Sequence, residues 1–122
     1  MTTFMDAAGL QLEAVGPTEV TGWIELGPSH HQPWGLVHGG VYTSAIESAA
    51  SLGASAAASP LVAVGVNNNT NFLRSMREGR VDVVARPIQQ GLTQQLWEVR
   101  ITDSEGRAVA VGQVRLQNVA PR

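Results

Sequence analysis

One charged side chain interrupts the otherwise uncharged and mostly small residues 39–59, and it is Glu47. At about 100° per residue, a helix over this stretch places Gly40, Ser44, Glu47 and Ser51 on one face, where small neighbours let a bulky group approach the carboxylate. Such a carboxylate can act as a nucleophile or a general base. A helical glutamate usually faces solvent. A solvent-exposed helix face normally carries several charged residues, however, and this stretch has only Glu47, so we favour a functional carboxylate here.

Two glycines, Gly39 and Gly40, stand where this helix is expected to begin. No side chain covers their backbone N–H groups, and a helix N-terminus favours negative charge, so these donors could hold the oxyanion of a tetrahedral intermediate. Taken alone, the two glycines are better explained by a turn-and-cap role. Gln32 and His38 flank the same point. His38 could serve as a general base, orient a neighbour through one ring nitrogen, or only cap the helix.

Composition excludes several other kinds of site. The chain has no cysteine, so disulfides, thiolate metal sites and cysteine nucleophiles are absent. It has no G-x-S-x-G elbow of a serine hydrolase, and its three histidines and Glu47 show no metal-ligand spacing, so we expect no metal. All eight basic residues are arginine, which leaves guanidinium groups as the strong phosphate ligands.

Charge and hydropathy also limit the partners. With a net charge of −2, the chain is not basic enough to predict a nucleic-acid-binding protein. No apolar run approaches the roughly 18 residues of a membrane span. Residues 1–10 lack the basic and long apolar regions of a signal peptide, so we expect a cytoplasmic protein.

The elements that must position these residues are one strand, one long helix and four further strands. Residues 10–26 are expected to form the first strand, and the helix runs from Gly39 to about Ser59, where Pro60 ends it. The apolar run Leu61 to Val66 predicts a strand buried on both faces, which continues to about residue 74. Three more strands are expected at 80–88, 95–101 and 107–118. Tight connections make the sheet mostly antiparallel, within a single α+β domain over residues 1–122.

Two segments carry a resemblance to a known family. The segment Gln32-Pro33-Trp34-Gly35-Leu36-Val37-His38-Gly39-Gly40, with Glu47, Ser48 and Ser51, resembles the active-site signature of hotdog-fold thioesterases. It is most similar to the branch that contains 4-hydroxybenzoyl-CoA thioesterases of the Arthrobacter type, 1,4-dihydroxy-2-naphthoyl-CoA hydrolases and phenylacetyl-CoA thioesterases. Residues 64–80 resemble the second strand and following turn of that family. The resemblance covers nearly the whole chain and implies a curved sheet wrapped around one central helix.

The resemblance implies hydrolysis of an acyl-CoA thioester and a role for each matching residue. Glu47 is the expected nucleophile or general base, and the Gly39 N–H the expected donor to the carbonyl oxygen. Gln32 and His38 would assist near the thioester and its leaving group, and Ser51 would position the attacking water. The family implies a homodimer or homotetramer with its active site between protomers. No cofactor is expected, because coenzyme A is part of the substrate.

Binding roles for three other residues are less direct. Arg74 is the best placed of three clustered arginines to hold the CoA phosphates, although these arginines could instead be solvated turn residues that contribute little. Thr93 could also touch the phosphates. Trp34 could wall the acyl pocket or only anchor its loop.

Two other functions remain open on the same fold. A hotdog dehydratase would act on hydroxyacyl thioesters, although its histidine and carboxylate are usually arranged differently. A non-catalytic acyl-CoA-binding protein would keep Glu47 as an idle group, because fold does not determine function. For a thioesterase, we expect an aromatic or a short to medium acyl group.

Overall fold

The computed structural model describes residues 3–121, so Met1, Thr2 and Arg122 lie outside it. In chain order the elements are α1 (Phe4–Ala8), β1 (Gln11–Val15), β2 (Val20–Leu26), the 3₁₀ turn η1 (Pro28–His30), α2 (Gly39–Ala58), β3 (Val62–Phe72), β4 (Gly79–Gln90), β5 (Gln94–Thr102) and β6 (Ala108–Val119). Within the described residues, neither α-helix is both long and apolar enough to span a membrane.

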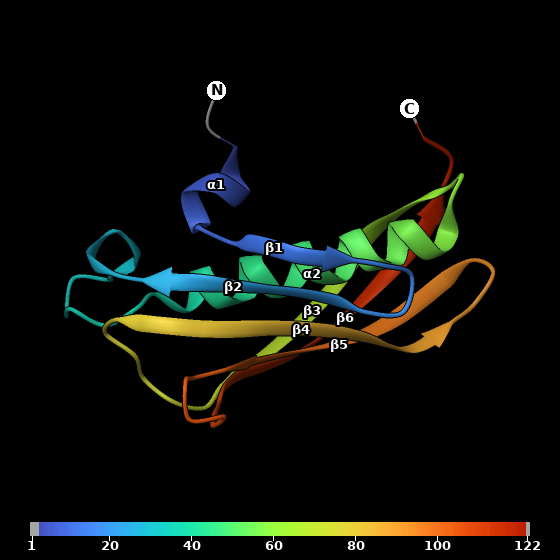
Figure 1. The fold of residues 1–122 in the computed structure, drawn as a ribbon. Coiled ribbons are helices and arrows are strands. Elements are labelled where there is room, and N and C mark those ends of the chain that lie inside the picture. The colour runs from blue at the N-terminus through green and yellow to red at the C-terminus, as the bar shows by residue number, and fades with distance from the viewer. Residues whose placement is uncertain (1–2, 122) are drawn as a thin grey trace.

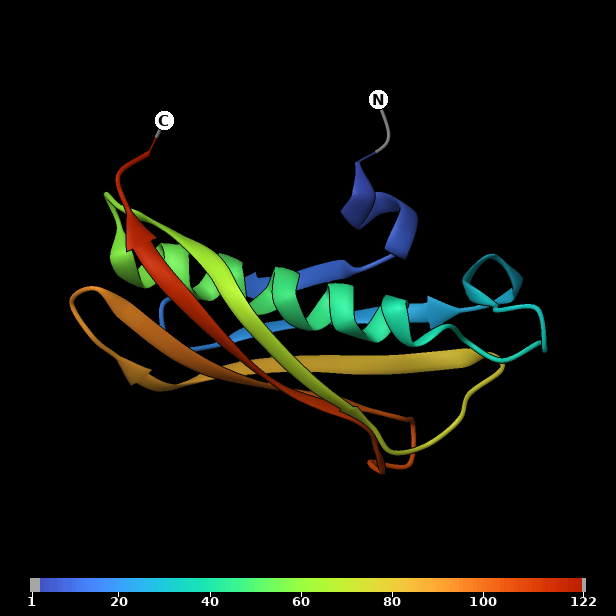
Figure 2. The ribbon, with the colours of Figure 1, turned by 180° about the vertical axis from the view of Figure 1, so that it is seen from behind.

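One six-stranded sheet curves around α2, in the strand order β1-β2-β4-β5-β6-β3 (Figures 1 and 2). Every pair of neighbouring strands is antiparallel. The structure therefore confirms the predicted α+β hotdog arrangement, including the helix that begins at Gly39 and stops before Pro60. Pro60 cannot continue a helix, because it lacks an N–H and its ring clashes with the preceding turn.

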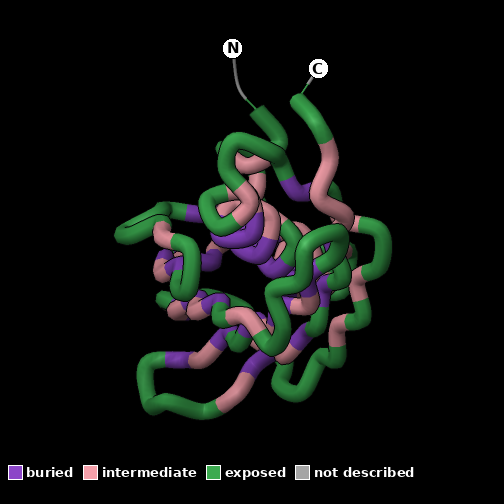
Figure 3. Tube along the Cα trace, turned by 90° about the vertical axis from the view of Figure 1, so that its right-hand side faces the viewer, coloured by how far each residue is buried: buried purple, intermediate pink, exposed green. Residues whose placement is uncertain are grey.

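The core lies between α2 and the concave face of the sheet, where the buried segments of Figure 3 meet. Val81, Val83 and Ala85 of β4 point inward, as their alternation predicts. Small helix residues let α2 approach the sheet closely. A Cβ atom at Gly53 would lie 2.6 Å from Cζ3 of Trp97, which is itself fully buried. Glycine at this position is thus a packing requirement.

The prediction of one continuous strand over residues 10–26 is wrong. Residues 10–26 form a hairpin of two strands, with Val15 paired with Val20, so the sheet has six strands where five were expected. The short helix α1 was also missed. Its sequence signals are present: Thr3 and Asp6 form a reciprocal capping box, and Gly9 ends the helix at φ 84°.

The prediction that the strand at Leu61 to Val66 is buried on both faces is also wrong. Strand β3 is the last strand of the sheet, and α2 covers only one of its faces. Val64 and Val66 are 50% and 55% exposed, while the preceding Ala63 faces the core. An apolar run therefore marks both a doubly covered strand and an edge strand with an apolar outer face, and the run alone does not distinguish them.

Candidate active site

His38 caps the start of α2 with its own side chain. Its Nδ1 accepts a hydrogen bond from the Gly40 N–H at 2.8 Å, and its carbonyl oxygen accepts from the Val41 N–H at 3.0 Å. Among residues 3–121, no hydrogen bond uses the Gly39 N–H. The first N–H group of the helix is therefore free to donate, at the end where the helix dipole favours negative charge.

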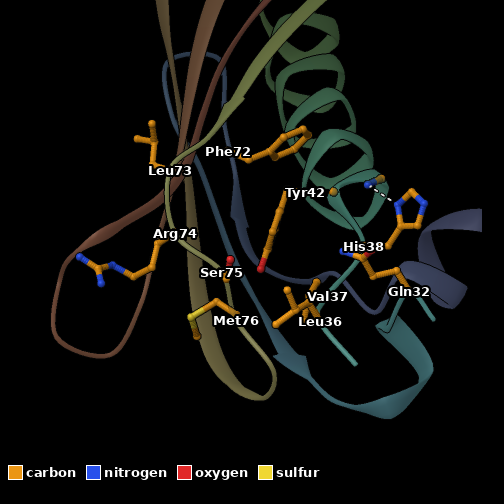
Figure 4. A pocket seen from close by; sticks show the side chains of 12 residues that line it. Gln32, Leu36, Val37, His38, Tyr42, Phe72, Leu73, Arg74, Ser75 and Met76 are labelled. Carbon is orange, nitrogen blue, oxygen red and sulfur yellow. Dashed lines mark hydrogen bonds between the residues drawn. The ribbon is translucent and has the colours of Figure 1, made fainter. Parts of the chain in front are cut away.

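A cavity of about 520 Å³ opens beside this helix start (Figure 4). It lies between residues 32–38, the first turn of α2 and residues 72–76. Backbone hydrogen bonds hold its walls: Gln32 N–H donates to the Leu36 carbonyl at 2.8 Å, and Val37 N–H donates to the Met76 carbonyl at 2.9 Å. The cavity brings together three of the predicted site residues, namely Gln32, His38 and Gly39, and it also includes Arg74.

Phe72 lies directly over the first residue of the helix. A Cβ atom at Gly39 would stand 2.8 Å from Cζ of Phe72, so the ring and the helix start approach closely only because residue 39 has no side chain. The Phe72 ring also packs against Tyr42, with ring centroids 6.3 Å apart and planes tilted by 43°. Two aromatic rings therefore border the cavity next to the free N–H.

Glu47 lies in a second hollow of about 370 Å³ on the same helix, with Thr43, Ser44, Ser48 and Ser51. Ser44, Glu47 and Ser51 of the predicted helix face meet in this hollow, whereas Gly40, predicted on the same face, does not line it. In the single chain, the Glu47 carboxylate is exposed. Between Gly39 and Glu47 the helix rises by about 12 Å, so this carboxylate and the free N–H belong to two separate groups within one chain.

Strand β3 orients the Glu47 carboxylate. The Asn68 side-chain amide donates to the Thr43 carbonyl at 3.1 Å and to Glu47 Oε1 at 3.4 Å, while Thr70 Oγ1 donates to Asn68 Oδ1 at 2.7 Å. Because a backbone carbonyl can only accept, the Thr43 carbonyl fixes the nitrogen end of the Asn68 amide toward the helix and Glu47. Gly65 makes room beside it, since a Cβ there would lie 3.3 Å from both Glu47 Cδ and Oε2.

The residues predicted to bind CoA are spread out in the single chain. The Arg74 side chain points away from the cavity (Figure 4). Arg77 donates to the Gly35 carbonyl and Arg80 pairs with Asp82, whereas Arg74 makes no ion pair within residues 3–121. Thr93 adjoins the far end of β6, about 30 Å along that strand from Arg74.

Trp34, predicted to wall the acyl pocket, is 77% exposed and does not line the cavity. The single chain therefore leaves its role untested.

Two residues at the site were missed by sequence reasoning. Tyr42 is 3% exposed, lines the cavity, and has a hydroxyl without a hydrogen-bond partner among the described residues. Burial raises its pKa to about 12. A large aromatic residue one turn after Gly39, in a helix of small residues, was the available signal. Asn68 is one of three consecutive asparagines, and its hydrogen bond to the Thr43 carbonyl identifies it as one that faces the helix.

Three comparisons place the chain among known proteins. A sequence model described as Thioesterase superfamily matches residues 35–110. A provisionally named esterase of Mycobacterium tuberculosis is 46% identical over 98% of this chain and 88% of its own length, and its solved structure superimposes with a TM-score of 0.94 over 98% of each chain.

Two further proteins carry more specific names. The 1,4-dihydroxy-2-naphthoyl-CoA hydrolase of Listeria monocytogenes is 32% identical over 87% of this chain and 87% of its own length. The structure of a thioesterase from Haemophilus influenzae matches with a TM-score of 0.88 and 28% identity, over 95% of this chain and 82% of that one.

Proposed function

Because this chain belongs to the thioesterase superfamily, we propose that it hydrolyses acyl-CoA thioesters to a free acid and coenzyme A, with an aromatic or a short to medium acyl group. The observation that carries the proposal is the free Gly39 N–H at the start of α2, in a cavity wall that it shares with Gln32 and His38. The names of the Listeria and Haemophilus proteins agree with this reaction.

In this proposal, the thioester carbonyl oxygen accepts a hydrogen bond from the Gly39 N–H. Negative charge develops on that oxygen when a nucleophile adds, and the positive end of the helix dipole stabilises it. His38 Nδ1 already accepts from Gly40, so a neutral ring carries its proton on Nε2 and acts as a donor. We therefore assign His38 and Gln32 to hydrogen bonding near the thioester, and we assign no cofactor beyond the coenzyme A of the substrate.

Glu47 can complete the reaction by either of two routes. A carboxylate oxygen can attack the carbonyl carbon, which expels the CoA thiolate and leaves a mixed anhydride for water to cleave. Alternatively, the carboxylate can take a proton from a water held by Ser51 as that water attacks. A single turnover in H₂¹⁸O tests the first route, because water that cleaves the anhydride at Glu47 Cδ leaves label in the Glu47 carboxylate, whereas the general-base route places label only in the product acid.

One protomer does not bring these two groups to one carbonyl. A general base must lie within about 3 Å of the proton that it removes, and Glu47 is about 12 Å along the helix from Gly39. We therefore propose that the partner's Glu47 completes each site in a homodimer, alone or within a tetramer. Strand β3 supports this, because it has a free edge beside Glu47 and presents the apolar Val64 and Val66.

The test is a panel of acyl-CoA substrates with the wild type and Glu47→Ala. We expect the wild type to hydrolyse at least one aromatic or short to medium member, and Glu47→Ala to lose at least about 100-fold in kcat. Glu19→Ala is the matched control, because Glu19 forms only an exposed ion pair with Arg86 and its loss should leave kcat unchanged.

Three results would contradict the proposal. These are no hydrolysis of any member by the wild type, binding of CoA without turnover, and formation of an enoyl product from 3-hydroxyacyl-CoA. The last two would indicate a binding protein and a dehydratase, respectively.

A further inference from the structure

The Glu47 carboxylate is exposed in the single chain, yet one of its two oxygens already has a partner. Oε1 accepts a hydrogen bond from the Asn68 side-chain amide at 3.4 Å. Oε2 accepts none from residues 3–121, and it lies beside Gly65, where an added Cβ would stand 3.3 Å away. Strand β3 therefore holds one carboxylate oxygen and leaves the other free to react.

Two other partners keep the Asn68 amide facing this carboxylate. Its nitrogen carries two N–H groups, one of which donates to the Thr43 carbonyl at 3.1 Å, while its oxygen accepts from the Thr70 hydroxyl at 2.7 Å. A flipped amide would set its oxygen against the Thr43 carbonyl oxygen, and neither atom can donate. The amide is thus anchored independently of Glu47, and its second N–H is directed at the carboxylate.

The Thr70 hydroxyl is itself confined by packing between the sheet and the helix. Thr70 pairs with Gly112 of β6, and a Cβ at Gly112 would lie 2.7 Å from Thr70 Oγ1 and 2.9 Å from Cγ2 of the fully buried Ile46. The hydroxyl therefore fits here only because residue 112 lacks a side chain. A continuous series of contacts runs from the core through Thr70 and Asn68 to Glu47.

Holding this carboxylate in place matters for the proposed chemistry. An exposed glutamate has several rotatable bonds and samples many positions, and restricting them costs conformational entropy. A nucleophile or general base must lie within about 3–3.5 Å of the atom on which it acts, so orientation before the substrate binds removes part of that cost from the reaction. The bond to Oε1 is long at 3.4 Å, as catalytic hydrogen bonds often are in the absence of substrate.

We propose that Asn68 is a positioning residue for Glu47, which holds Oε1 so that Oε2 is presented to the thioester across the protomer interface. This inference rests on the proposed function and adds a residue to its machinery. In the general-base route, Oε2 takes a proton from the water whose oxygen bonds to the carbonyl carbon. In the nucleophilic route, Oε2 forms that bond itself, and the C–S bond then breaks with its electron pair leaving on sulfur. Asn68 gains and loses no proton in either route.

The test measures kcat and KM for a good acyl-CoA substrate with the wild type, Asn68→Leu, Glu47→Ala and the double variant. Leucine is close to asparagine in size and shape but cannot donate a hydrogen bond. We expect Asn68→Leu to lower kcat about tenfold or more and to change KM by at most about threefold. In the Glu47→Ala background, the same substitution should change kcat by less than about twofold, because the carboxylate that Asn68 positions is already absent.

Asn69→Leu is the matched control on the same strand. Asn69 is exposed, and the alternation of a strand directs its side chain away from α2. We expect this variant to keep kcat and KM within about twofold of the wild type.

Thr70→Val is a second probe, and it decides the question if circular dichroism shows that Asn68→Leu does not fold. Valine has nearly the shape of threonine and leaves the Asn68 donor in place, but the amide loses the hydroxyl that holds its oxygen. We expect kcat to fall about threefold or more, again only when Glu47 is present.

A kcat for Asn68→Leu within twofold of the wild type, or an equal loss with and without Glu47, would overturn this inference. Either result would mean that Asn68 only ties β3 to α2, and the same criteria apply to Thr70→Val. The thioesterase function would stand in both cases, provided that Glu47→Ala still loses its activity. Absence of hydrolysis by the wild type would instead defeat the proposed function, and this role with it.

Discussion

The chemistry proposed for this protein depends on two residues of different kinds, a main-chain N–H at Gly39 and a side-chain carboxylate at Glu47. Both were recognisable in the sequence, because one marks the helix start and the other is the only charge within α2. The sequence placed both residues on one helix but did not show that they lie in two different hollows, although the rise of about 12 Å between them follows from helix geometry. Tyr42 and Asn68 were not predicted. Tyr42 matters because it lines the cavity, and Asn68 matters because its side chain on β3 faces α2, and neither placement is visible in the sequence.

The Gly39 donor can be tested by removing its hydrogen without removing the helix. Proline is favourable at the first helical position, and His38 already has the extended backbone, φ −67° and ψ 132°, that a residue before proline prefers. We expect Gly39→Pro to have a kcat about 100-fold or more below that of Gly39→Ala. The alanine variant is the matched control, because both add a Cβ against Phe72 but only proline lacks the N–H.

Steady-state kinetics with a good acyl-CoA substrate measure this difference, and circular dichroism checks that α2 persists in both variants. Equal kcat values for Gly39→Pro and Gly39→Ala would show that the Gly39 N–H does not contact the oxyanion.

At the scale of elements, α2 was predicted well and the sheet less well, for physical reasons. The helix has unambiguous limits in Gly39 and Pro60, and its small residues agree with its buried position. The 10–26 hairpin was read as one strand because its alternating pattern continues on both sides of the turn at residues 16–19. Strand β3 was misjudged because an apolar run does not say whether helix, solvent or another chain covers its outer face.

The close packing of α2 on β5 predicts the effect of one added methyl group. Gly53→Ala should lower the free energy of unfolding by about 1–3 kcal/mol, because the new Cβ would lie 2.6 Å from Trp97 Cζ3 and 2.9 Å from Val20 Cγ2. Alanine normally gains up to about 1 kcal/mol over glycine inside a helix, so a net loss means that overpacking dominates.

Urea titrations at one protein concentration measure this change. Gly27→Ala is the control, because nothing lies within 4 Å of its added Cβ, and we expect a change of at most about 1 kcal/mol. A Gly53→Ala protein more stable than the wild type would refute the packing argument.

At the scale of the whole molecule, the shared site predicts complementation between inactive subunits. Glu47→Ala lacks the carboxylate and Gly39→Pro lacks the donor, so each homodimer should be nearly inactive. When the two are mixed and reassembled, about half of the dimers are mixed, and each of these has one site with both groups intact. We expect the mixture to recover about a quarter of wild-type activity.

Activity assays before and after reassembly measure this recovery, with the two proteins reassembled separately as controls. If Gly39 and Glu47 act within one protomer, the mixture stays as inactive as its components. That outcome would contradict the shared site without affecting the assignment of either residue to the reaction.

The free donor at Gly39 also affects how the site tolerates mutation. Because the N–H belongs to the main chain, nineteen of the twenty encoded residues would supply it, and only proline would not. The contact with Phe72, by contrast, depends on the absence of a side chain at residue 39. Most substitutions at residue 39 would therefore disturb the packing of Phe72 at the cavity wall while keeping the proposed oxyanion donor.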